Sequence, residues 1–137
     1  MTKQHSLARV AELTRQYGAQ RLNIFTKEFI DALSHPDNAA PRCQMRMIEY
    51  EPPELEEPWM NVLLAGMAEF IARREDLDPP AWTEKPERFL QKPKFWGVKP
   101  ETRAYMLSET PGPFRRRNLF CGYIWLYADR WSSFDGA

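Results

Sequence analysis

The chain has 137 residues, and its charges balance, with 19 Lys and Arg against 19 Asp and Glu. Apolar residues make up 43% of it and aromatic residues 13%, which excludes a disordered chain and is enough to build one hydrophobic core. The zero net charge removes the overall field that would attract the chain to nucleic acid or to a membrane. We therefore expect one domain over residues 1–137.

Residues 1–34 predict a helical hairpin. Apolar side chains recur at steps of three and four in residues 7–17 and again in 22–33, which is typical of amphipathic helices. Gly18 suits the position after the first helix, where a left-handed backbone is favourable. A short strand over residues 21–25 is the alternative, and we favour a helix because the apolar spacing continues beyond it.

Residues 35–57 predict an irregular, proline-rich arm. Prolines interrupt this stretch repeatedly, and residues 45–50 are the only part that suggests regular structure, either as a short strand or as an irregular extended piece. A loop of this length is unusual inside a compact domain, so we interpret it as a mobile or partner-bound segment.

The clearest helix covers residues 58–75. Pro58 suits a first helical turn, and a wide apolar stripe follows it until the prolines at 79 and 80. Gly66 lies in the middle of this stripe, where it costs about 1 kcal/mol relative to Ala. We therefore expect Gly66 to allow another chain segment to pack closely against the helix.

The remainder of the helical core region, which covers residues 58–137, predicts short elements separated by prolines. Thr83 suits the cap of a short helical segment, Pro100 opens a further helix, residues 114–120 read as extended, and residues 123–131 are compatible with a closing helix. The expected fold is mainly α: a compact helical domain with an irregular proline-rich arm and short elements in its C-terminal half.

No residue pattern indicates catalysis. His5 lies in the terminal tail and His35 precedes a proline loop, and the sequence has no glycine-rich phosphate loop, HExxH or GxSxG motif. No Cys and His set has zinc spacing. We expect a protein that is not an enzyme and has no metal or cofactor site. Cys43 and Cys121 are expected as free thiols, with a disulfide between them as the alternative.

The chain also lacks signals for export or membrane insertion. Residues 1–6 contain no apolar leader segment, and the longest apolar runs are too short to span a bilayer. We therefore expect a cytoplasmic protein without a membrane partner.

Charge is segregated along the chain despite the overall balance. Residues 1–47 carry seven basic and four acidic side chains, residues 48–80 carry two and nine, and residues 81–137 carry ten and six. The acidic block is either the solvated face of one segment or a patch that docks a basic partner, which includes the chain's own basic C-terminal part.

The residues that could bind a partner follow from this pattern. They are the arginines Arg115, Arg116 and Arg117 with the neighbouring Phe114, the hinge residue Trp96, and the acidic residues Glu54, Glu56 and Glu57. Guanidinium groups bind carboxylates and phosphates, and nearby aromatic rings can stack on a base. Three interpretations stay open for the arginines: pairing within the chain, with Arg115 and Arg117 on one face, binding to a partner protein, or binding to nucleic acid.

A set of short motifs lies between residues 59 and 120. It comprises Ala-Glu-Phe-Ile-Ala-Arg-Arg at 68–74, Pro-Ala-Trp-Thr at 80–83, Arg-Phe-Leu at 88–90, Pro-Lys-Phe-Trp at 93–96 and Pro-Phe-Arg-Arg-Arg-Asn at 113–118. This region resembles an uncharacterised helical domain that follows an Xre-type helix-turn-helix in bacterial, mainly actinobacterial, regulator and antitoxin-like proteins. The resemblance implies a regulatory module and, as a partner, a nucleotidyltransferase-like toxin.

The resemblance does not extend to DNA binding, because residues 1–34 predict at most a hairpin and no helix-turn-helix. Our first hypothesis is a non-catalytic protein-interaction or regulatory module, antitoxin-like in character, that binds a partner protein. The alternative is a nucleic-acid-binding transcriptional regulator that uses the Arg115–Arg117 cluster. Homo-oligomerisation is compatible with both.

Overall fold

The computed structural model describes residues 5–95 and 100–122. The α-helices are α1 (Leu7–Tyr17), α2 (Leu22–Leu33), α3 (Pro41–Ile48), α4 (Pro58–Arg74), α5 (Pro100–Glu109) and α6 (Gly112–Arg115). Short 3₁₀ turns are η2 (Ala19–Arg21), η3 (Pro36–Asn38), η4 (Ala81–Glu84) and η5 (Pro86–Arg88), and the strands are β1 (Lys94–Phe95) and β2 (Leu119–Phe120). The prediction of a mainly α fold is confirmed.

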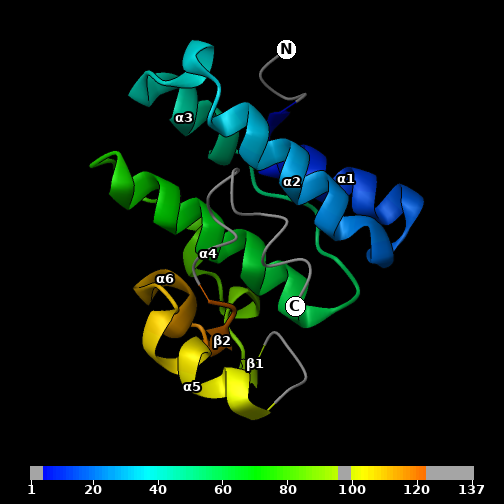
Figure 1. Cartoon of the computed structure of the whole chain (residues 1–137). Helices are drawn as coiled ribbons and strands as arrows, with labels where there is room; N and C mark the ends of the chain where they lie inside the picture. Colours follow the sequence, from blue (N-terminus) through cyan, green and yellow to red (C-terminus); the bar gives the residue numbers. More distant parts are fainter. Residues whose placement is uncertain (1–4, 96–99, 123–137) are drawn as a thin grey trace.

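Helix α4 is the central element. It lies between α1, α2 and α3 on one side and η4, η5, α6 and β2 on the other (Figure 1). Every side chain from Met60 to Glu69 is buried, which is the pattern of a helix that is enclosed on all sides. The helix predicted over residues 58–75 is confirmed. In the part of the chain that the structure describes, neither α4 nor any other helix is long and apolar enough to cross a membrane.

The N-terminal hairpin forms as predicted. Helices α1 and α2 pack against each other, and residues 21–25 belong to the start of α2 rather than to a strand. The Ser6 hydroxyl accepts a hydrogen bond from the Arg9 amide at 3.1 Å and caps α1. Gly18 ends the helix with a left-handed φ of 113°, and its amide donates to the Thr14 carbonyl at 2.8 Å.

The prediction for residues 45–50 is wrong, because residues 41–48 form helix α3. Pro41 occupies its first turn, where the missing N–H is not needed, so this proline starts a helix instead of interrupting the chain. The buried Gln44 amide donates to the carbonyls of Leu33 at 3.2 Å and Asn38 at 2.6 Å and ties α3 to the end of α2. Residues 49–57 are the longest irregular stretch that remains in the arm.

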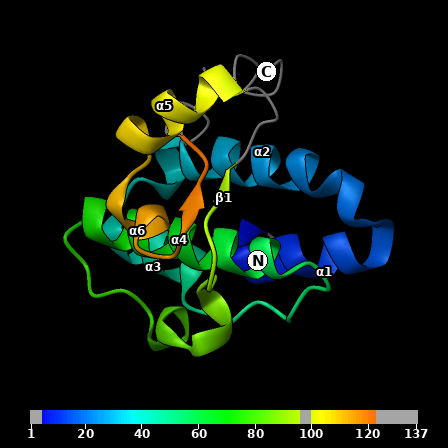
Figure 2. The ribbon, with the colours of Figure 1, turned by 90° about the horizontal axis from the view of Figure 1, so that it is seen from below.

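The extended segment predicted over residues 114–120 is wrong in its first half. Residues 112–115 form the single helical turn α6, and only Leu119 and Phe120 are extended, in a parallel pairing with Lys94 and Phe95. Figure 2 shows these two short strands side by side. The predicted helix at 123–131 lies outside the described residues.

Gly66 has the packing role predicted from its position in α4. A Cβ atom at residue 66 would lie 2.6 Å from Cε1 of the Phe114 ring, so the ring occupies the space that any larger side chain would need. Phe114 is fully buried there, and it brings α6 against the middle of α4. The helix propensity lost at Gly66 is therefore offset by the burial of an aromatic ring.

Replacing Gly66 by Ala should destabilise the fold. The methyl group would overlap the Phe114 ring, and overpacking of this kind costs more than the propensity gain of Ala returns, so we expect a net loss of about 1–2 kcal/mol in the free energy of unfolding. Urea unfolding followed by circular dichroism measures it. Gly112→Ala is the matched control, because no atom lies within 4 Å of its new Cβ. Equal unfolding midpoints for the two variants would contradict this account.

Candidate functional site

The three consecutive arginines that follow Phe114 do not form one basic surface. Arg117 is fully buried, Arg116 keeps 39% of its side chain exposed, and Arg115 is exposed. The Arg115 guanidinium donates to the carbonyls of Ser108 at 3.4 Å and Thr110 at 3.2 Å, where α5 ends. Because Arg115 lies in a helical turn, the shared face predicted for it and Arg117 does not exist.

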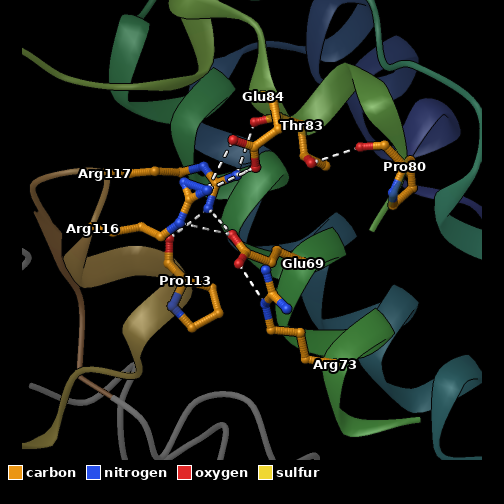
Figure 3. Close-up of polar contacts among 8 residues, drawn as sticks. All are labelled: Glu69, Arg73, Pro80, Thr83, Glu84, Pro113, Arg116 and Arg117. Carbon is orange, nitrogen blue, oxygen red and sulfur yellow. Dashed lines mark hydrogen bonds and ion pairs between the residues drawn. The ribbon is translucent and has the colours of Figure 1, made fainter. Parts of the chain in front are cut away.

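Arg117 joins three segments inside the protein (Figure 3). Its Nη1 donates to Oε1 of Glu69 on α4 and, at 2.7 Å, to the Pro113 carbonyl at the start of α6. Its Nη2 donates to the Thr83 carbonyl in η4 at 2.8 Å. The guanidinium lies over the Phe89 ring, 4.7 Å from its centroid. Of the three interpretations that the sequence leaves open for the arginines, Arg117 follows the first, which is pairing with an acidic residue of the same chain.

Glu69 is the centre of an ion-pair network. Its carboxylate is 2% exposed and contacts Arg117, Arg73 at 2.6 Å and Arg116 at 3.5 Å, while Arg116 also makes two hydrogen bonds to Glu84 at 2.9 and 2.8 Å (Figure 3). Burial raises the pKa of the Glu69 carboxyl, but the hydrogen bonds from Arg117 and Arg73 outweigh it and hold the pKa below its ordinary value. Glu69 is therefore ionised at neutral pH.

The two most distinctive motifs of the chain meet at this network. In Pro-Ala-Trp-Thr, the Trp82 indole donates to the Ile48 carbonyl at 3.0 Å, and the Thr83 hydroxyl donates to the Pro80 carbonyl at 2.7 Å. In Pro-Phe-Arg-Arg-Arg-Asn, Phe114 fills the space over α4 and Arg117 holds Glu69. Both motifs therefore stabilise the fold. Trp96, the other aromatic residue predicted to bind a partner, lies outside the described residues.

The stability contributed by Glu69 should depend on pH. Removing one partner of a buried ion pair costs about 3–5 kcal/mol, so we expect Glu69→Gln to lose about that much at neutral pH. Because the pKa of Glu69 is lower in the folded state than its ordinary value of 4.5, its contribution is complete above that pH and is lost as the pH falls toward the folded-state pKa. Urea unfolding at about pH 7, 5 and 3 should show that the free energies of unfolding of Glu69→Gln and of the unmodified chain converge as the pH falls.

Glu12→Gln is the control for this measurement, since Glu12 forms an exposed pair with Arg9 at 3.2 Å. We expect the free energy of unfolding of Glu12→Gln to differ from that of the unmodified chain by less than about 1 kcal/mol at each pH. A Glu69→Gln deficit that stays constant across the whole range would show that Glu69 does not act through its charge.

The predicted acidic residues stand on a segment that is fixed to α4. The buried side chain of Asn61 accepts from the Leu55 amide at 2.7 Å and donates to the Leu55 carbonyl at 3.0 Å. Leu55 points into the core at 6% exposure, and the alternation along an extended chain leaves its neighbours Glu54 and Glu56 exposed. This pair of hydrogen bonds sets which side chains of the arm face solvent.

A second buried side chain fixes the beginning of the same segment. Arg88, 1% exposed, donates to the Pro52 carbonyl at 2.8 Å and to the Asn61 carbonyl at 3.3 Å, and its guanidinium lies 4.9 Å from the Trp82 ring centroid. Glu51 pairs with Lys85 at 2.8 Å and with Arg88 at 3.5 Å, and the hydrogen bond from Lys85 lowers the pKa of its carboxyl. The segment is therefore held at both ends.

An open depression of about 640 Å³ lies between this segment and the end of α1. Its lining comprises Glu54, Glu56 and Glu57 with Arg15, Thr14, Gly18, Ala19, Leu55 and Met60. The structure thus brings all three predicted acidic residues to one place, far along the sequence from Arg15. Within the described parts of the chain, none of the three carboxylates has a hydrogen bond or ion pair to another side chain.

Sequence reasoning missed Asn61 and Arg88, the residues that hold the acidic segment beside this depression. Asn61 lies in an apolar run and has no motif around it, and Arg88 belongs to a short motif that carries no signal of burial. The signal available for Asn61 was a polar residue in the middle of the apolar stripe of residues 58–75, because a buried amide needs partners. Among residues 5–95 and 100–122, no group of three His, Cys, Asp or Glu side chains is arranged to hold a metal ion. No disulfide joins Cys43 and Cys121.

Comparison with known proteins identifies no relative. A scan against protein-family models matches none, and searches of the curated proteins and of the solved structures give no match to the chain.

Replacing Asn61 by Ala should release the acidic segment. The change leaves the amide and the carbonyl of Leu55 unpaired in the interior, which costs about 1–3 kcal/mol for each group. We expect faster amide hydrogen exchange in residues 51–57 by mass spectrometry, with little change in the peptides of α6. Gln91→Ala, an exposed position that lines no pocket with this segment, should leave exchange in the segment as it is. Unchanged exchange in Asn61→Ala would refute the role assigned to Asn61.

Proposed function

We propose that the chain is a non-catalytic interaction module that holds a basic segment of a partner protein in the depression beside α1. The observation that carries this proposal is the convergence of Glu54, Glu56 and Glu57 on one concave surface, where Arg15 is the single cation among the described residues. Carboxylates that have no ion pair within the described chain can accept Lys or Arg side chains without first breaking internal contacts.

The composition of the depression favours lysine- or arginine-bearing segments over small cations. Leu55 and Met60, 6% and 5% exposed, add a small apolar part to the lining, and the long stems of Lys and Arg can cross it while their charged ends pair with the carboxylates. Each exposed ion pair contributes only about 0.2–1 kcal/mol, so several pairs and the apolar contact are needed together for a stable complex. Charge attraction of this kind also speeds the encounter and weakens with salt.

We further propose that this module is regulatory and antitoxin-like and acts in the cytoplasm. The motif resemblance over residues 59–120 supports this assignment and makes a nucleotidyltransferase-like toxin the first partner to test. The burial of Phe114 and Arg117 supports a distribution of roles in which the motifs stabilise the fold and the acidic segment recognises the partner.

The nucleic-acid alternative receives less support from the arrangement of the arginines. Arg117 is buried against Glu69, and Arg116 makes two hydrogen bonds to Glu84, so of the three predicted cations only Arg115 has no acidic partner in the described chain. One such arginine provides far fewer phosphate contacts than a nucleic-acid site requires.

Neutralising the depression should weaken binding of a basic peptide. We expect the triple variant Glu54→Gln, Glu56→Gln, Glu57→Gln to bind an alternating Lys–Leu hexapeptide about tenfold more weakly in isothermal titration calorimetry. Backbone NMR shifts in the unmodified chain should concentrate at Leu55 and Met60. Higher salt should weaken binding to the unmodified chain more than to the variant.

The matched control removes the same charge at the opposite end of α4. Glu75→Gln, Asp76→Asn, Asp78→Asn should keep the affinity of the unmodified chain, because these residues do not line the depression. Equal weakening by the two triple variants would show a general charge effect and refute the site. Salt-dependent binding of duplex or single-stranded DNA that is lost in Arg115→Ala would instead favour the nucleic-acid alternative.

A further inference from the structure

We infer that the α1–α2 hairpin carries a second binding surface, whose occupant is the same hairpin of another copy of this chain. The surface is a groove of about 370 Å³ between the two helices. It is separate from the acidic depression, with which it shares no lining residue. The inference therefore does not rest on the proposed function.

The floor of the groove is apolar. Val10 and Leu13 of α1 face Phe25 and Phe29 of α2 across it. Val10 and Phe29 are buried, whereas Leu13 and Phe25 are only partly covered, so the apolar surface continues from the core to the outside. Helices of a monomer usually place polar residues along such a flank, and an apolar flank indicates a contact.

One exposed aromatic side chain adjoins this floor at the end of α1. Tyr17, 53% exposed, lies beyond Leu13 at the end of α1, with its ring centroid 6.2 Å from that of Phe25. Large exposed aromatic and aliphatic residues that adjoin a groove are the type of side chain that anchors protein interfaces.

The charges on the two walls of the groove are opposite. Arg9 stands on the α1 wall and Glu28 on the α2 wall. Arg9 has an exposed contact to Glu12 at 3.2 Å, and Glu28 has no ion pair among the residues that the structure describes. In a twofold dimer, each contact between two different residues occurs twice, once in each direction. Two copies of the hairpin can therefore form two identical Arg9–Glu28 ion pairs around a shared apolar centre.

This self-complementarity selects a second copy as the occupant. A groove with one cation and one anion on facing walls offers no preference to a partner of uniform charge, in contrast to the acidic depression beside α1. The antiparallel packing of two hairpins yields a four-helix arrangement, in which Leu13 and Phe25 of each copy become fully covered.

The experiment is a charge-swap series measured by analytical ultracentrifugation of the full chain over about a hundredfold dilution. We expect the unmodified chain to approach twice its mass of 16.2 kDa at the highest concentration. Arg9→Glu and Glu28→Arg should each raise the dissociation constant by about tenfold or more, since each places like charges together twice. The double variant Arg9→Glu, Glu28→Arg should restore the dimer.

Arg46→Glu, an exposed reversal on α3, is the control and should leave the dissociation constant unchanged. Circular dichroism of each variant establishes that it is folded before its mass is interpreted. A chain that stays monomeric at every concentration overturns the inference. A dimer that Arg9→Glu and Arg46→Glu weaken equally, or that the double variant does not restore, also overturns it, because the contact then lies elsewhere.

Discussion

The enclosure of α4 on all sides is the constraint on which the other elements depend. The middle of α4 is buried on every face, so the carboxylate of Glu69 cannot reach solvent and needs cations beside it, and Arg73 of the same helix supplies only one of them. Arg117 meets this need, and its remaining donors bind the carbonyls of Thr83 and Pro113. One buried charge thereby determines how η4 and α6 dock on the central helix.

Helix α4 also holds neighbouring segments through uncharged side chains. The Phe114 ring enters the space over Gly66, and the Asn61 amide holds the Leu55 backbone. Each contact joins α4 to a segment that has little regular structure of its own. Packing and hydrogen bonding to α4 replace the internal hydrogen bonds that longer helices or strands would supply.

The parts of the fold that the sequence predicts are those with local signals. Periodic apolar spacing and the glycine at position 18 predict the hairpin, and the mid-helix Gly66 predicts a close contact. Helix α3 was missed because its amphipathic pattern is short and its starting proline resembled an interruption. The sequence does not predict that Arg117 is buried, because its partner Glu69 is distant in sequence. Local pattern does not tell which of three adjacent arginines points inward. The acidic residues were predicted, whereas their convergence with Arg15 depends on tertiary packing.

The hold of Asn61 on Leu55 has a consequence for the thermodynamics of recognition. A flexible acidic loop would lose conformational entropy when a ligand orders it, at about 1–2 kcal/mol for each residue of backbone that becomes fixed. Residues 51–57 are instead immobilised in advance by Asn61 and Arg88, so that entropy is lost during folding and not during association. The carboxylates of this segment are thus preorganised, so ordering of the segment offsets little of the free energy that the weak ion pairs contribute to affinity.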